Sequence, residues 1–69
     1  MPGHVYRVIE VVGTSPSGLD SAIEAAIARA NVSLRGIDWF EVSEIRGHIR
    51  DGAVAHYQVS LKIGFHLED

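Results

Sequence analysis

The sequence predicts an α+β domain with the element order β-α-β-β, in which a three-stranded antiparallel sheet curls around one helix. Three observations carry this prediction. The run His4–Val12 is rich in β-branched residues, and the stretch that begins at Leu19 has helical spacing. The dipeptide Asp51-Gly52 is a strong turn signal between two further β-like runs. With 69 residues, the chain has room for a single domain over residues 1–69.

The first strand is expected over His4–Val12. Its apolar residues occupy both odd and even positions, so both faces of the strand are expected to be at least partly covered. The stretch Gly13–Pro16 then ends the strand and opens the helix almost without a loop. Ser15 suits the N-cap, and Pro16 suits the first helical position, where a missing N–H costs nothing.

The helix is predicted from the positions of its apolar residues, which recur at intervals of three and four. Gly36 is expected to supply the stop at its C-terminal end. Many of the other helical positions hold alanine, so the sheet can approach the helix closely. The apolar stripe consists of Leu19, Ile23, Ala26, Ile27, Ala30 and Leu34.

The run after Asp51-Gly52 alternates regularly between two faces, as a strand does. The helix is expected to pack on its apolar face. That face consists of Tyr57, Val59, Leu61, Ile63, Phe65 and Leu67. The opposite face consists of His56, Gln58, Ser60, Lys62, Gly64 and His66.

The run Ile37–Gly47 holds the only tryptophan of the chain. Adjacent residues of a strand point to opposite faces, so Phe40 is expected to face the helix and Trp39 to face away from it. An outward indole needs a second covering layer, either a neighbouring subunit or a flat ligand. Gln58 lies on the neighbouring strand and also points outward, so the ring and the amide are expected to share one outer surface.

The same run predicts an irregularity in the sheet. Continued alternation after Val42 would bury the charged residues Glu44 and Arg46. We therefore expect a β-bulge or a sharp coil between Ser43 and Ile45, which redirects the side chains beyond it.

Composition argues against several classes of partner. The formal net charge is −3, with six basic against nine acidic residues, so the basic excess that binds nucleic-acid phosphates is missing. No apolar run approaches the roughly 18 residues of a membrane span, and Met1–His4 lacks the features of a signal peptide. We expect a cytoplasmic protein that binds neither nucleic acid nor membrane.

The sequence assigns no catalytic residue and no metal site. Cysteine is absent, and the four histidines have no ligand-like spacing, so a metal site within one chain is not expected. Ser15, Ser17 and His48 are residue types used in nucleophilic catalysis, but nothing places a base beside a serine. The stretch Gly13–Gly18 matches neither a P-loop nor a dinucleotide fingerprint. Enzymatic activity is not expected.

The length predicts oligomerisation. A chain this short buries only about 60% of its unfolded surface when it folds, so its own core is marginal. Disulfides cannot compensate, because the chain has no cysteine. Association between copies is the remaining common device of small domains.

Taken alone, the candidate site residues have simpler interpretations. Tryptophan is enriched at protein interfaces, so Trp39 fits an interface anchor. Gln58 by itself fits a solvated strand residue. Arg46 fits an ion pair with Glu44 or Glu41.

Across nearly its whole length, from about Tyr6 to Glu68, the chain resembles the dodecins, a family of small flavin-binding proteins. The order and spacing of six segments carry the resemblance. They are Val12-Gly13-Thr14-Ser15, Ala26–Ala30, Asp38–Val42, Glu44–Gly47, Tyr57-Gln58-Val59 and Gly64-Phe65.

The resemblance implies a hollow homododecamer that holds flavins in pairs between the tryptophans of two-fold-related subunits. It implies that Trp39 stacks on the isoalloxazine of FMN or riboflavin. Gln58 would then bind the pyrimidine edge of the flavin, and Asp38 and Arg46 would line the same pocket. An amide suits this edge because it can both donate and accept hydrogen bonds.

Some members of the family also bind coenzyme A, so the resemblance makes this a possible second ligand. The matching positions in this chain are His4, Tyr6, Arg7, Arg29 and His66. Relatives often carry lysine or arginine where this chain carries His4 and His66.

The function expected from the resemblance is non-enzymatic storage and buffering of flavin, with photoprotection. Stacking on Trp39 supplies the mechanism, because an indole in contact with an excited flavin can transfer an electron and return the pair to its ground state. Two alternatives stay open at this point. One is a flavin-dependent redox enzyme, and the other is a structural oligomerisation module without a ligand.

Overall fold

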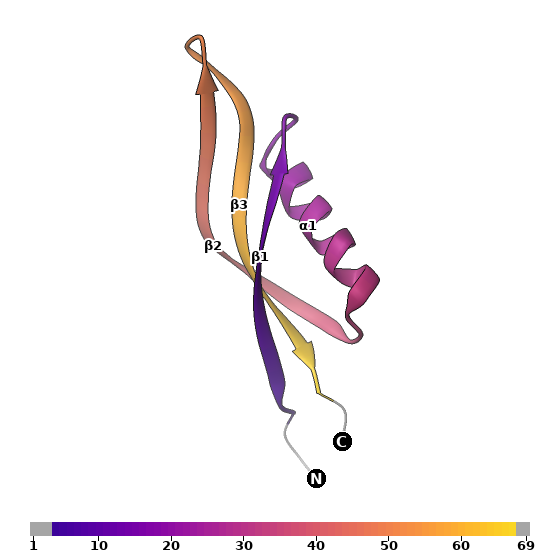
Figure 1. Ribbon diagram of the computed structural model, residues 1–69. Coiled ribbons are helices and arrows are strands. Elements are labelled where there is room, and N and C mark those ends of the chain that lie inside the picture. The colour runs from indigo at the N-terminus through magenta and orange to yellow at the C-terminus, as the bar shows by residue number, and fades with distance from the viewer. Residues whose placement is uncertain (1–3, 68–69) are drawn as a thin grey trace.

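The computed structural model describes residues 4–67. It contains one helix and three strands in the predicted order β-α-β-β (Figure 1). The elements are β1 (Tyr6–Ser15), α1 (Leu19–Ser33), β2 (Ile37–Arg50) and β3 (Ala53–His66).

The three strands form one antiparallel sheet with the order β1-β3-β2. The last strand of the chain is therefore the centre of the sheet, and β2 lies at an edge. The helix lies on one face, where it packs mainly against β1 and β3 (Figure 1). The α+β prediction with an antiparallel sheet and a single helix is confirmed.

The core lies between the helix and the centre of the sheet. The core is small because α1 contributes alanines to it. Their short side chains allow the helix backbone to approach the sheet. The approach is close at Gly13, where an added Cβ would lie 2.2 Å from the carbonyl oxygen of Ala22 and 2.8 Å from the Cβ of Ala26. The buried core residues are Ala22, Ala26 and Ala30 of α1 with Val59, Leu61 and Ile63 of β3.

Much of the apolar side of β2 is left uncovered by residues 4–67. The β2–β3 hairpin extends beyond the end of the helix (Figure 1). On the helix-facing side of β2, Phe40 is 47% exposed and Ile45 is 60% exposed. Ile49 and its partner Val54 near the hairpin tip are exposed as well. A soluble monomer rarely leaves a continuous apolar surface of this kind in water.

The predicted bulge is present, displaced by one residue. The register shifts between Val42, opposite Leu61, and Glu44, opposite Ser60, so Ser43 is the extra residue. The shift places Glu44 and Arg46 on the outer face, away from the helix. The Ser43 hydroxyl contacts the carbonyl oxygen of Ser60 at 3.1 Å, which ties the bulge to the central strand. Two further shifts, between Ile37 and Trp39 and between His48 and Ile49, were not predicted.

The predicted N-terminal cap of the helix is wrong. β1 continues to Ser15, because Gly13–Ser15 pair with β3. Gly18 takes the N-cap position, and the helix starts at Leu19, so Pro16 lies outside it. The Ser15 hydroxyl instead accepts a hydrogen bond from the backbone N–H of Ser17, at 3.0 Å. Pairing with the sheet outweighs the local capping preference here.

Gly36 also differs from its predicted role. The C-cap is Leu34, whose N–H donates to the carbonyl of Ala30, and Gly36 follows two residues later. Its φ of 72° lies in the left-handed region that glycine adopts without strain. Its carbonyl accepts a hydrogen bond from the N–H of His66 at 3.0 Å. Gly36 therefore turns the chain into β2 and joins that turn to the end of β3.

Candidate functional site

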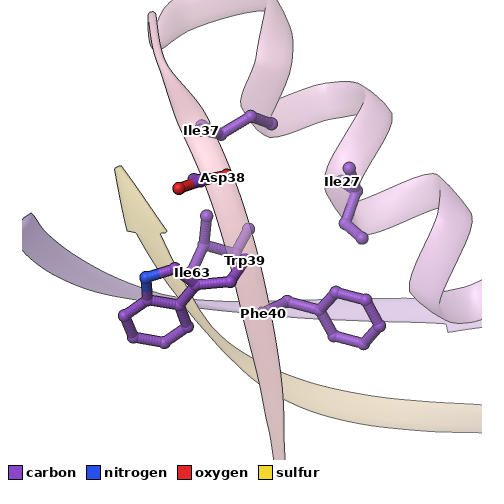
Figure 2. Close-up of a pocket in the computed structure, with 6 residues that line it drawn as sticks. All are labelled: Ile27, Ile37, Asp38, Trp39, Phe40 and Ile63. Atoms are coloured by element: carbon purple, nitrogen blue, oxygen red, sulfur yellow. The ribbon is translucent and has the colours of Figure 1, made fainter. Parts of the chain in front are cut away.

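Trp39 lies near the start of β2, opposite Gly64 of β3. Trp39 and Phe40 leave opposite sides of β2, and Phe40 points toward α1 (Figure 2). The predicted orientation of the two rings is therefore confirmed. The Trp39 side chain is partly open to solvent, with 40% of the residue exposed. It is an aromatic surface that the described part of the chain leaves partly uncovered.

Tyr6 and Asp38 lie beside the indole. The ring centroids of Tyr6 and Trp39 are 6.1 Å apart. The Tyr6 hydroxyl donates to Oδ2 of Asp38 at 2.8 Å. Asp38 is the extra residue in the register shift between Ile37 and Trp39. His66 completes the group, with its ring centroid 5.6 Å from that of Tyr6. We call Tyr6, Asp38, Trp39 and His66 the tryptophan end of the sheet.

The hydrogen bond to Asp38 raises the pKa of the Tyr6 hydroxyl, with smaller contributions from desolvation and from the carboxylate charge. A raised pKa means that the fold favours the neutral phenol. This stabilisation is present at neutral pH and is lost as the pH rises through the raised pKa.

We expect Asp38→Asn to lower the pKa of Tyr6, because an amide accepts the hydrogen bond of the phenol more weakly than a carboxylate does, and because the carboxylate charge is removed. Alkaline titration followed by the ultraviolet absorbance of phenolate measures this shift. A Tyr57→Phe background leaves Tyr6 as the only tyrosine, since the chain has two. An unchanged titration midpoint would show that Asp38 does not control the Tyr6 hydroxyl.

An apolar pocket of about 160 Å³ lies between the start of β2 and the helix (Figure 2). Ligand pockets for drug-sized molecules are usually about 300–1,000 Å³. This 160 Å³ pocket is therefore too small to enclose a three-ring ligand by itself. The pocket is lined by Ile27, Ile37, Asp38, Trp39, Phe40 and Ile63.

Gln58 does not lie beside Trp39 within one chain. It is opposite Arg46 and Thr14, whereas Trp39 is opposite Gly64, six positions further along β3. At about 3.3 Å per residue of strand, the two sites are about 20 Å apart. They share the outer face of the sheet, as predicted. They are not neighbours on that face within a single chain, because alternation determines the face and register determines the distance.

Arg46 and His48 accompany Gln58. Arg46 forms an ion pair with Glu44, which is one of its two simpler interpretations. Nε2 of His48 is 3.4 Å from Oε1 of Gln58, and the His48 ring stacks on His56 with centroids 5.1 Å apart. We call Arg46, His48 and Gln58 the glutamine end of the sheet. The position of His48 beside Gln58 was not predicted. His48 is two residues from Arg46 on β2, so alternation could have assigned both to the outer face.

The residues matched to coenzyme A binding gather only in part. Nδ1 of His4 is 2.9 Å from Nε2 of His66, and Tyr6 lies against His66. Arg7 is on the opposite face of β1 from Tyr6, because adjacent strand residues alternate. Arg29 donates to the Ser33 hydroxyl at 3.4 Å, on the helix surface. The two arginines are therefore not at the tryptophan end.

Residues 4–67 contain neither a metal cluster within the chain nor a membrane-spanning helix. No group of three or more histidine, aspartate or glutamate side chains is arranged to hold a metal ion in this part of the chain. No helix in it is long and apolar enough to cross a membrane.

Known proteins have a similar sequence and the same fold. A curated dodecin from Thermus thermophilus is 57% identical over 67 residues, which is 97% of each protein. The solved dodecin from Streptomyces coelicolor is 59% identical and superposes with a TM-score of 0.92, covering 100% of this chain and 99% of that one. A curated calcium dodecin from Mycobacterium tuberculosis is 30% identical over 63 residues, covering 91% of this chain and 89% of the relative. The sequence model of the Dodecin family matches residues 5–68, and this chain therefore belongs to the dodecin family.

Proposed function

We propose that this protein binds FMN or riboflavin without turning it over, and so stores, buffers and photoprotects the flavin. The observation that carries the proposal is the tryptophan end of the sheet. There, an indole that is 40% exposed stands beside a hydrogen-bonded tyrosine and a carboxylate. Such a surface suits a flat aromatic ring system. Membership of a family of small flavin-binding proteins supports the same ligand.

The complete site is proposed to form between copies of the chain in a homododecamer. Trp39 and Gln58 are about 20 Å apart on one chain, by the strand rise of about 3.3 Å per residue. A flavin that stacks on Trp39 and bonds to Gln58 must therefore take these residues from different copies. The uncovered apolar side of β2 supports association of this kind.

The stored flavin is protected by its contact with the indole. If a flavin binds there, the electron-rich indole of Trp39 would donate an electron to the light-excited ring system and recover it, with no net chemical change. This step needs van der Waals contact between the two rings. Bound flavin is therefore expected to be almost non-fluorescent.

We keep coenzyme A as a second candidate ligand. Its phosphates call for nearby cations, and Arg7 lies on the opposite face of β1 from Tyr6. A coenzyme A site would therefore, like the flavin site, combine residues from different copies.

Titration of riboflavin fluorescence with purified protein tests the proposal. Saturable quenching, recovery of intact riboflavin on denaturation and no turnover with a chemical reductant are expected. Turnover would favour the redox enzyme. A protein that leaves the fluorescence of added riboflavin and FMN unchanged would favour a structural module and contradict the proposal.

We expect Gln58→Ala to weaken riboflavin binding by about 1–3 kcal/mol, the usual cost of leaving a buried polar edge unpaired. The oligomer is expected to stay intact, because the side chain carries little apolar area. Fluorescence titration measures the effect. Asn31→Ala, which removes an exposed amide from α1, is the matched control and should bind like the wild type. Equal affinity in both variants would make Gln58 a solvated strand residue.

A further inference from the structure

The Trp39 indole occupies the space above Gly64 that a side chain would need. A Cβ added to Gly64 would lie 2.1 Å from Cε2, 2.2 Å from Cζ2 and 2.6 Å from Nε1 of the indole. Real Cβ contacts of this kind essentially never occur below 3.0 Å. The contacting atoms belong to a rigid double ring, so the whole indole would have to move. The residue opposite Trp39 therefore has to be glycine for the ring to lie where it does.

The indole has a neighbouring ring that is itself held by a hydrogen bond. Tyr6 stands beside it, with ring centroids 6.1 Å apart, and Asp38 holds the Tyr6 hydroxyl at 2.8 Å. Gly64 itself is buried although Trp39 is 40% exposed. The indole thus rests on the backbone of β3 and keeps its remaining surface open. A glycine inside a strand commonly marks such a close approach.

We propose that Gly64 is a positioning residue that orients Trp39 for stacking on a flat ligand. By leaving space for the indole, it lets the ring lie against the sheet and present its outward surface to the flavin. The ligand part of this inference rests on the proposed function. The orientation of the free indole does not, so the two parts can be tested separately.

Gly64→Ala in the full-length protein tests the orientation first. The chain has one tryptophan, so its tryptophan emission, and the quenching of that emission by acrylamide, report on Trp39 alone. We expect the displaced indole of the variant to show a shifted emission maximum and easier quenching, without any ligand present. Gly47→Ala is the matched control. It adds the same methyl group to the same sheet, 3.0 Å from the His56 carbonyl oxygen and away from the indole.

Riboflavin titration then tests the ligand part. Gly64→Ala is expected to lose about tenfold in affinity, within the range that aromatic stacking contributes, while Asn31→Ala on the exposed surface of α1 binds like the wild type. A double-mutant cycle with Trp39→Ala separates positioning from a general loss of fold. In the Trp39→Ala background, Gly64→Ala is expected to change riboflavin affinity little, because no indole remains to be displaced.

The outcomes are distinct. If Gly64→Ala fails to fold but Gly64→Ala with Trp39→Ala folds, the clash with the indole is demonstrated. If both fail to fold, or if tryptophan emission and quenching are those of the wild type, the inference is overturned. If the wild type does not bind riboflavin, the proposed function fails, and emission and quenching alone decide whether Gly64 orients Trp39.

Discussion

Trp39→Ala is expected to lower riboflavin affinity by about 1–3 kcal/mol, which corresponds to roughly 5–150-fold, and to restore fluorescence to the flavin that still binds. Both effects follow from the loss of one ring. Stacking supplies much of the contact area of a flat ligand, and electron-transfer quenching needs the indole within contact distance. Fluorescence titration of riboflavin with wild type and variant measures affinity and quenching in one experiment.

The control for this experiment is the oligomeric state of each protein in the same buffer. An interface anchor would behave differently from a ligand platform. Its loss would break the oligomer first, and flavin binding would fall only as the assembly dissociated. Trp39→Phe is the conservative variant, since it keeps a smaller ring, and we expect it to bind riboflavin with intermediate affinity. An intact Trp39→Ala oligomer that binds and quenches riboflavin as the wild type does would contradict the proposed mechanism.

Ile45→Asp is expected to abolish the assembly. Twelve copies of the 7.5 kDa chain would have a mass of about 90 kDa, which light scattering distinguishes from small oligomers. Ile45 is 60% exposed in the single chain, on the side of β2 that also carries Phe40 and Val42. If another copy covers this side, a carboxylate at position 45 is buried without a partner, and its desolvation costs several kcal/mol per interface.

Ile45→Val is the matched control, because it keeps the position apolar and removes only one methyl group. We expect it to assemble like the wild type. A wild type that is monomeric or dimeric at micromolar concentration would contradict the proposed homododecamer. An Ile45→Asp variant of full mass would show that the apolar side of β2 is not part of the interface.

The periodicity of the sequence was sufficient to predict the fold. A spacing of three and four residues indicated the helix, and strict alternation assigned the two faces of β3, because both patterns arise from backbone geometry alone. The same alternation placed Phe40 inward and Trp39 outward. It also predicted a bulge near Ser43, since two charged residues would otherwise have been buried. Local capping signals were less informative, because pairing of Ser15 with β3 outweighed its preference for the N-cap.

The tertiary structure decided where the outward residues lie relative to one another. Alternation assigns Trp39 and Gln58 to the same face, but the register of β2 against β3 places them opposite residues six positions apart. Asp38 accepts a hydrogen bond from Tyr6 and has no partner opposite it on β3, because the register shifts between Ile37 and Trp39. No local sequence pattern predicted this shift. The indole rests on Gly64 because the same register sets these two residues opposite each other. Sequence periodicity reports the direction of each side chain along its own strand, whereas distances across a sheet depend on how separate strands align.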